Sequence, residues 1–199
     1  MTLHDISIPL AAGTPEWPGD TPYSCGWAWE IAKGASVNVA SFTTSPHVGT
    51  HADAPLHVKD GAPAADALPL ARFAGPARVV SLDAVPSLGD TRIERLLLRT
   101  GRSIAGGAFP ASWPVLPLDT VRALLARGLV LLGVDAPSVD ERESKSLPLH
   151  HCLFDGGAAI VENLDLRGVP DGAYDLIALP LKLTGLDAAP LRAALRPLP

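Results

Sequence analysis

The sequence predicts a single α/β domain that is rich in short strands and has few helices. The chain of 199 residues is long enough for one full hydrophobic core and short for two, and 47% of its residues are apolar. Several segments either alternate apolar and polar residues or form short apolar runs, and both patterns are typical of strands. Twenty prolines and eighteen glycines are dispersed along the chain, as expected for many short elements joined by fixed turns. We therefore expect one domain over residues 1–199.

The expected strands follow one another along the whole chain. They cover residues 5–9, 27–31, 36–43, 77–82, 95–99, 129–134, 158–164 and 174–179. The clearest helix covers residues 119–127, because its apolar residues share one face, Asp119 or Thr120 can cap its start, and Gly128 follows its last turn. The pattern also allows two shorter helices, near residues 67–73 and 190–196.

Composition and charge exclude several classes of function. The net charge is −5 and no run of lysine or arginine occurs, which disfavours nucleic acid as a partner because phosphate binding needs clustered cations. No stretch approaches the roughly 18 uncharged apolar residues of a membrane span. The N-terminus has no basic region followed by an apolar stretch, so we expect a cytoplasmic protein without a signal peptide. Two cysteines, Cys25 and Cys152, are too few for a disulfide framework and are expected to be buried free thiols.

A concentration of metal-binding side chains marks residues 45–57. The segment reads Ser-Pro-His-Val-Gly-Thr-His-Ala-Asp-Ala-Pro-Leu-His and holds three of the six histidines of the chain. Its potential ligands are His47, His51, Asp53 and His57. Imidazole together with carboxylate suits Zn²⁺, with Mn²⁺ or Fe²⁺ as substitutes. The alternative is that these side chains only form hydrogen bonds within a loop.

The same segment must fold back on itself to build one metal site. Its prolines and Gly49 disfavour a regular helix. In a straight strand the four candidates would share one face, but at about 3.3 Å per residue His47 and Asp53 would lie roughly 20 Å apart. Ligands of one metal must each lie about 2.0–2.2 Å from it. Gly49 and Pro55 are the residues suited to the reversal, whereas His51 and Asp53, two positions apart, can bracket a metal locally.

A second group of candidate ligands lies far along the chain. His150 and His151 are adjacent, so in an extended segment their side chains diverge and only one is expected to bind metal, with the other in a supporting position. Glu162 interrupts an apolar run, where an unpaired carboxylate would be costly. A metal would compensate this charge, and an arginine partner is the alternative. Cys152 is a further alternative as a thiolate ligand, although we expect a buried thiol.

Residues 47–57, His-Val-Gly-Thr-His-Ala-Asp-Ala-Pro-Leu-His, resemble the signature of the cyclase-like metal hydrolase family, which includes bacterial kynurenine formamidases and isatin hydrolases. The resemblance extends to nearly the whole chain through Pro-Glu-Trp-Pro-Gly-Asp at 15–20, His-His at 150–151, Glu-Asn-Leu at 162–164 and Leu-Pro-Leu-Lys-Leu at 179–183. It implies a compact α/β domain of the swivelling β/β/α kind, usually paired as a homodimer. It also implies a centre of two divalent metal ions, usually zinc.

The resemblance carries over a set of metal ligands. They are His47, His51, Asp53, His150 and Glu162. The first three would bind one metal, and Asp53 and Glu162 would bridge to the second. The resemblance favours His150 over His151 because its spacing to Glu162 fits the family pattern.

The resemblance also implies an activity. It is the hydrolysis of N-formyl-L-kynurenine to L-kynurenine and formate, an arylformamidase step of tryptophan degradation. His57 would be the catalytic acid/base or, alternatively, a ligand of the second metal. Trp17, in a turn rich in proline and glycine, would bind the substrate ring, with a core tryptophan as the alternative. Gly-x-Ser-x-Gly is absent, which weighs against a serine hydrolase.

Two other functions stay open at this stage. The first is a related amide hydrolase of the same family, such as isatin hydrolase, because the metal signature does not measure the pocket. The second is a non-catalytic metal-binding module. Structural zinc sites favour closed sets of ligands rich in cysteine, so the histidines and carboxylates here favour catalysis.

Overall fold

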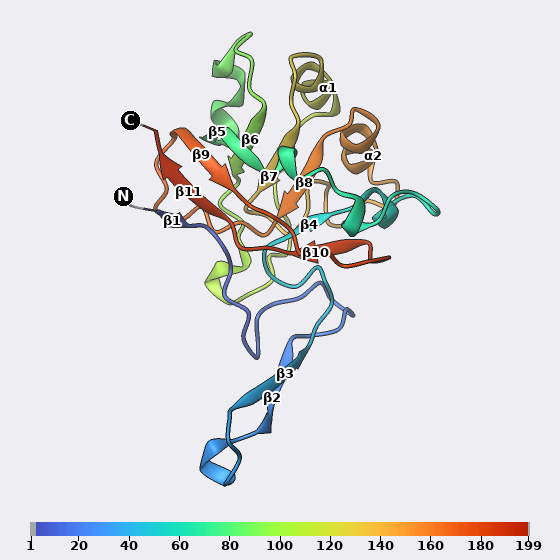
Figure 1. The fold of residues 1–199 in the computed structure, drawn as a ribbon. Helices are drawn as coiled ribbons and strands as arrows, with labels where there is room; N and C mark the ends of the chain where they lie inside the picture. Colours follow the sequence, from blue (N-terminus) through green and yellow to red (C-terminus); the bar gives the residue numbers. More distant parts are fainter. Residues whose placement is uncertain (1–2, 199) are drawn as a thin grey trace.

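A nine-stranded mixed sheet lies at the centre of the computed structural model, which describes residues 3–198 (Figure 1). The predicted domain 1–199 also includes residues 1–2 and 199, which lie outside the described residues. The strands of this sheet are β1 His4–Asp5, β4 His51–Asp53, β5 Ala74–Ser81, β6 Arg95–Arg99, β7 Leu131–Val134, β8 Ala159–Glu162, β9 Gly172–Ile177, β10 Ala188–Pro190 and β11 Ala194–Pro197. Their order is β1-β11-β9-β5-β6-β7-β8-β4-β10, so the first and last strands of the chain pair with each other.

The four central strands are parallel and the others are antiparallel. β5, β6, β7 and β8 run in the same direction. Helices α1 (Leu118–Ala126) and α2 (Pro148–Asp155) lie beside β7 and β8 (Figure 1). Helix α1 lies in the connection from β6 to β7, and α2 lies in the connection from β7 to β8. The α/β class predicted from the sequence is therefore confirmed. No helix in the described residues has the length and apolar character needed to cross a membrane.

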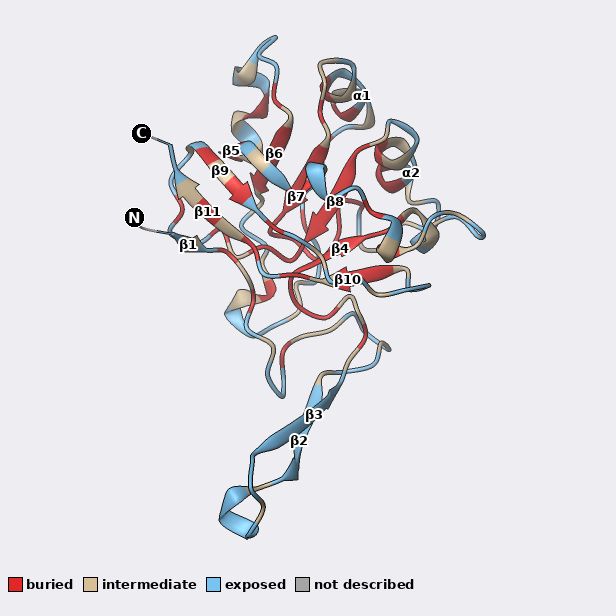
Figure 2. Cartoon of the chain, viewed as in Figure 1, coloured by how far each residue is buried: buried red, intermediate tan, exposed pale blue. Residues whose placement is uncertain are grey.

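The inner strands β6, β7 and β8 of the sheet are buried on both faces (Figure 2). Along β6, Leu96 and Leu98 belong to the core cluster that contains Val121 of α1 and Leu153 of α2. Leu97, which points the other way, belongs to a second cluster enclosed by the curled antiparallel strands. Burial on both faces explains why β6, β7 and β8 read as continuous apolar runs rather than as alternating patterns.

A second, two-stranded sheet projects from this body (Figures 1 and 2). It is a hairpin of β2 (Ser24–Trp29) and β3 (Val39–Thr43), and every residue of both strands is exposed. We call residues 24–43 the arm. Cys25 lies on it and is exposed, so the expectation of a buried thiol is wrong for this residue. Cys152 is half-buried on α2, where it packs against the core on the helix side.

Every predicted strand overlaps a strand of the structure, but three short strands and one helix were not foreseen. The unforeseen strands are β4, β10 and β11, and the unforeseen helix is α2. The helix allowed near 190–196 is wrong, because residues 194–197 pair with β9. The helix near 67–73 is wrong too, because only short 3₁₀ turns form there. The 3₁₀ turns are η1 Ile31–Lys33, η2 Pro55–His57, η3 Ala65–Ala67, η4 Leu70–Arg72, η5 Leu82–Leu88 and η6 Ile104–Gly106.

The predicted helix 119–127 is confirmed with a shift of one residue, but its predicted cap is wrong. The helix runs from Leu118 to Ala126, and the N-cap residue is Pro117, which makes no side-chain cap hydrogen bond. Pro117 still supplies the carbonyl that accepts the hydrogen bonds of the amides of Thr120 and Val121. The first turn is therefore closed by the backbone, and Asp119 pairs instead with Arg122 on the exposed face.

Candidate metal centre

The signature segment is held in a tight reversal before β4. Gly49 has a φ of +72°, and a Cβ atom there would lie 2.5 Å from Cδ2 of Leu10, so only glycine fits without displacement. Next to it, the hydroxyl of Thr50 donates to the carbonyl of Asn163 at 2.6 Å and accepts the amide of Ile8 at 2.8 Å. These contacts tie the start of β4 to the end of β8. The reversal expected at Gly49 is present, and Pro55 begins η2.

Pairing of β4 with β8 brings the two distant groups of candidate ligands together. His51 and Asp53 are two residues apart on β4 and share one side of the sheet, whereas Ala52 between them points into the core. In the register of the sheet, His51 lies directly opposite Glu162 of β8. His150 reaches the same place from the first turns of α2. The site is therefore built by the predicted strand β8 together with β4 and α2, which the sequence pattern did not reveal.

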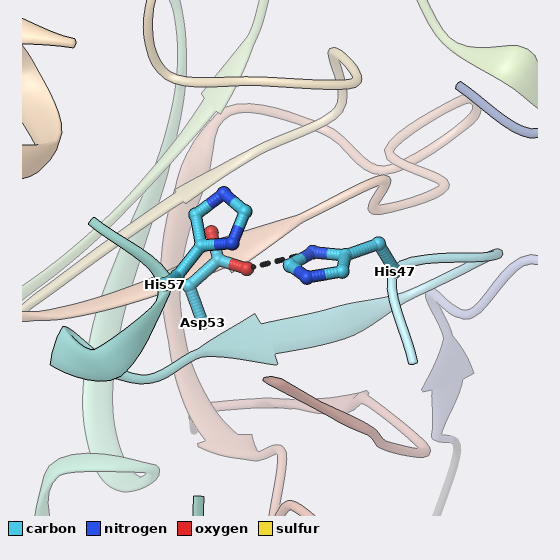
Figure 3. A group of neighbouring side chains, drawn as sticks. All are labelled: His47, Asp53 and His57. Atoms are coloured by element: carbon cyan, nitrogen blue, oxygen red, sulfur yellow. Dashed lines mark ion pairs between the residues drawn. The ribbon is translucent and has the colours of Figure 1, made fainter. Parts of the chain in front are cut away.

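The donor atoms form a first cluster around one oxygen of Asp53. Nδ1 of His47 is 3.2 Å from Oδ1 of Asp53 and 3.2 Å from Nε2 of His51. The same nitrogen of His51 is 3.3 Å from Oδ1 of Asp53 and 3.7 Å from Oε2 of Glu162. Figure 3 shows the ion pair between His47 and Asp53, with the ring of His57 close to the same carboxylate. Four donors thus surround one small volume.

A second cluster uses the remaining oxygens of the same two carboxylates. Nε2 of His150 lies 3.3 Å from Oδ2 of Asp53 and 3.5 Å from Oε1 of Glu162. Asp53 and Glu162 therefore each present one oxygen to the first cluster and one to the second. This is the arrangement expected of two carboxylates that bridge a pair of cations.

Both clusters fit divalent metal ions. Donors bound to a tetrahedral metal at about 2.0–2.1 Å lie about 3.3–3.4 Å from one another. The donor pairs here lie 3.2–3.7 Å apart. In addition, both oxygens of Asp53 and Nε2 of His150 are buried without a hydrogen-bond partner among the described residues. Buried polar atoms without partners are costly, so this donor set calls for bound cations.

Each histidine of the two clusters has an inner ring nitrogen, which faces the donor cluster, and an outer ring nitrogen, which faces away from it. The outer nitrogens make hydrogen bonds to other groups of the protein. Nε2 of His47 is 2.9 Å from Asp187, Nδ1 of His51 is 2.9 Å from the carbonyl of Gly49, and Nδ1 of His150 is 2.7 Å from Asp140. Because a carbonyl or carboxylate only accepts, each outer nitrogen carries a hydrogen, and in the neutral ring the inner nitrogen then has a free lone pair. Sequence reasoning did not identify Asp140 or Asp187, since no spacing links them to the signature.

Burial and nearby charges shift the pKa values of this cluster strongly. Burial, reinforced by the charge of Asp53, raises the pKa of Glu162 to about 7. For His47 and His150, burial by itself would lower the pKa, but hydrogen bonds to neighbouring carboxylates raise it to about 10 in each. In the metal-free protein both rings are therefore protonated at neutral pH. Metal binding has to displace these protons, so metal affinity falls as the pH is lowered.

His57 lies at the mouth of the site. Its Nδ1 is 3.1 Å from Oδ2 of Asp187, and its ring centre is 4.4 Å from that of His47. Burial lowers its pKa, so the ring is neutral at neutral pH. Its donor atom also lies within 4.8 Å of those of His47 and Asp53, so the distances alone admit His57 both as an acid/base and as a ligand.

The remaining candidates lie apart from the donor clusters. His151 is exposed on α2, on the side away from His150. Cys152 packs toward the core on the helix side, so it is not placed to ligate. For Glu162 the alternative of an arginine partner is wrong, because within residues 3–198 only histidines lie within ion-pair distance of it.

A cavity of about 480 Å³ opens over the clusters. The residues that line it include His51, His150 and Glu162 of the clusters, and also Trp17. Trp17 is 37% exposed and packs edge-on against Phe109, with ring centres 5.4 Å apart. The alternative of a core tryptophan is therefore wrong, since Trp17 faces the cavity.

Comparison of the amino-acid sequence with known proteins identifies the family of this chain and its relatives. Residues 4–141 match the family described as putative cyclase. The chain is 43% identical to a kynurenine formamidase of Bordetella petrii over 98% of each chain. It is 45% identical to a kynurenine formamidase of Salinibacter ruber, over 100% of this chain and 99% of that protein.

Solved structures share the fold over almost the full length. A potential metal-dependent hydrolase with cyclase activity has a TM-score of 0.84 and 28% identity, over 100% of this chain and 99% of that one. A predicted metal-dependent hydrolase from Bacillus stearothermophilus has a TM-score of 0.81 and 29% identity, over 98% and 97%. Isatin hydrolase A from Ralstonia solanacearum, at 19% identity over 98% and 91%, has a TM-score of 0.78 and shares the fold.

Proposed function

The chain belongs to the putative cyclase family, and from this membership we propose that it is an arylformamidase that hydrolyses N-formyl-L-kynurenine to L-kynurenine and formate. The observation that carries the proposal is the pair of carboxylates, Asp53 and Glu162, that present one oxygen each to two adjacent donor clusters beneath a cavity. Near-full-length relatives at 42–45% identity carry the name kynurenine formamidase, which supports the substrate.

We propose two divalent metal ions per chain, most simply zinc, because imidazole and carboxylate donors suit this ion. The ligands would be His47, His51, Asp53, His150 and Glu162, with the two carboxylates shared. When bound, such ions lower the pKa of a water to about 7 and polarise the formyl oxygen. The two buried donor clusters support one metal ion at each of the two positions.

His57 is proposed as the acid/base rather than as a ligand. Its Nδ1 is taken up by Asp187, which leaves Nε2 free at the mouth of the cavity. A neutral imidazole at this place can accept a proton from the attacking water and return it to the aniline nitrogen as the C–N bond breaks. The products are then formate and the free amine. Trp17, which lines the same cavity, would contact the aromatic ring of the substrate.

Cations in the cavity wall favour a substrate with an amino-acid tail over isatin. Arg142 and Lys145 line the cavity, and the guanidinium of Arg142 lies 5.7 Å from the centre of the Phe109 ring. A carboxylate on the substrate tail would find a complementary charge there, whereas isatin, a flat neutral bicycle, has no carboxylate to pair with it.

We therefore expect kcat/KM for N-formyl-L-kynurenine at least about tenfold above that for isatin, a difference of about 1.4 kcal/mol in transition-state binding. Both substrates would be measured with one zinc-loaded preparation. Formanilide, which has the same scissile bond without the amino-acid tail, is the matched substrate control and should fall below N-formyl-L-kynurenine. A preference for isatin would overturn the substrate and leave the metal hydrolase in place.

We also propose a homodimer in which the arm packs against a second copy of the chain. The arm carries a row of exposed apolar side chains: Trp27, Trp29, Ile31, Val37, Val39 and Phe42. The register of β2 and β3 places Trp27 and Phe42 on one face of the hairpin. An isolated two-stranded hairpin is marginal in water, and an apolar surface of this kind marks an interaction site.

The double substitution Trp27→Ser and Phe42→Ser is expected to convert a dimer into a monomer. Light scattering coupled to size exclusion gives the mass directly. Lys33→Ala at the tip of the arm removes a charge but no apolar contact and should leave the dimer intact. A monomeric wild-type protein, or an unchanged dimer in the double variant, would contradict the proposal that the arm forms a dimer interface. We further propose a cytoplasmic location on the sequence grounds given above.

A further inference from the structure

One oxygen of Asp187 contacts two histidines of the site. Oδ2 lies 2.9 Å from Nε2 of His47 and 3.1 Å from Nδ1 of His57. Figure 3 shows these two rings close to Asp53. Asp187 itself is not among the residues that line the cavity, so its contact with the site is through these two histidines.

A carboxylate can only accept hydrogen bonds, so both ring nitrogens that face Asp187 carry hydrogen. In the neutral, metal-binding form of His47 this leaves Nδ1 with the lone pair, and Nδ1 is the atom that lies 3.2 Å from Asp53 in the first donor cluster. For His57 it leaves Nε2 with the lone pair that a base needs. The same contact therefore selects the tautomer of a metal ligand and of the acid/base.

We propose that Asp187 is a positioning residue that fixes, through one oxygen, the orientation and tautomer of both His47 and His57. The part that concerns His57 rests on the proposed function, whereas the part that concerns His47 rests on the metal site alone. Because the oxygen is shared, loss of Asp187 weakens metal binding and proton transfer together. A carboxylate behind a metal-binding histidine typically changes metal affinity by about 10–100-fold when it is removed.

The backbone around Asp187 is held without its side chain. The carbonyl of Asp187 accepts the amide of Ala54 at 2.8 Å, and the carbonyl of Leu186 accepts the amide of Ala65 at 2.8 Å. The amide of Gly185 donates to Oδ1 of Asp66 at 3.2 Å. The next residue, Ala188, begins the pairing of β10 with β4. Shortening the Asp187 side chain should therefore leave this segment in place.

The test uses Asp187→Ala and Asp187→Asn, with Asp66→Ala as the matched control. Asp66 supports the same segment but contacts neither histidine. Zinc affinity, measured by competition with a chelator, should fall by about 10–100-fold in Asp187→Ala. At saturating zinc, kcat for N-formyl-L-kynurenine should still fall by at least about tenfold, with KM within about threefold of wild type, because an interaction made only in the transition state is lost.

The control and the second variant separate the outcomes. Asp66→Ala should keep both zinc affinity and kcat near wild type. Asp187→Asn keeps the shape of the side chain and an acceptor oxygen but not the charge, so its zinc affinity and kcat should lie between those of the wild type and Asp187→Ala. If circular dichroism shows that Asp187→Ala does not fold, Asp187→Asn takes its place in the test. The proposal would be overturned if the Asp187 variants had the same zinc affinity and kcat as Asp66→Ala. It would also be overturned if saturating zinc restored their kcat fully. If the wild type does not hydrolyse the formamide, the proposed function fails and the zinc measurement still decides the contact with His47.

Discussion

Asp53→Asn is expected to remove at least one of the two metal ions and to lower kcat by about 10³-fold, since metal ions supply several kcal/mol of transition-state stabilisation. Both oxygens of Asp53 are fully buried, and each faces histidine nitrogens of a different donor cluster. An amide keeps one acceptor oxygen and replaces the other with a donor NH₂, which cannot bind a cation. One of the two positions therefore loses its shared ligand although the side chain keeps its shape.

Elemental analysis after zinc reconstitution and removal of excess metal gives the number of metal ions per chain. Steady-state kinetics on the same sample gives kcat. Asp155→Asn, at the exposed end of α2, makes the same chemical change away from the site and should keep two ions and full activity. Two ions per chain in Asp53→Asn, with near wild-type turnover, would show that Asp53 does not bridge. One ion or fewer in the wild type would argue against the binuclear centre itself.

His57→Ala is expected to lower kcat by at least about 10²-fold while both metal ions stay bound, since general acid–base catalysis contributes about 10²–10⁴-fold. The ring is placed at the cavity mouth, its only hydrogen bond to another side chain in the described residues is to Asp187, and burial lowers its pKa so that it can accept a proton at neutral pH.

The control for this variant is His151→Ala. His151 is the exposed neighbour of His150, and its loss should change neither turnover nor metal content. Metal analysis of His57→Ala decides between the two roles left open by the distances. If metal content drops together with activity, His57 is a ligand of the second ion. If activity survives with metal bound, another group transfers the proton.

Where tertiary contacts and local pattern agree, the fold was predictable. β6 was predicted with its full range, because Leu96, Leu97 and Leu98 form an apolar run that is buried on both faces of a parallel sheet. Residues 190–196 were predicted wrongly, because the apolar residues Leu191, Ala194 and Leu195 fit one face of a helix as well as they fit a strand. Pairing of β11 with β9 decided the outcome, and that pairing depends on a partner distant in sequence.

Local chemistry by itself determined which residue types are candidates for the metal site. His51 and Asp53 share one side because alternate residues of a strand do, and Gly49 marked the reversal that places His47 beside them. The tertiary structure alone decided how the rings are supported. Asp187 reaches His47 across 140 residues, and Asp140 reaches the proton-bearing side of the His150 ring from before α2. The tautomer of a histidine depends on what its outer nitrogen contacts, and such long-range contacts leave no periodicity in the sequence.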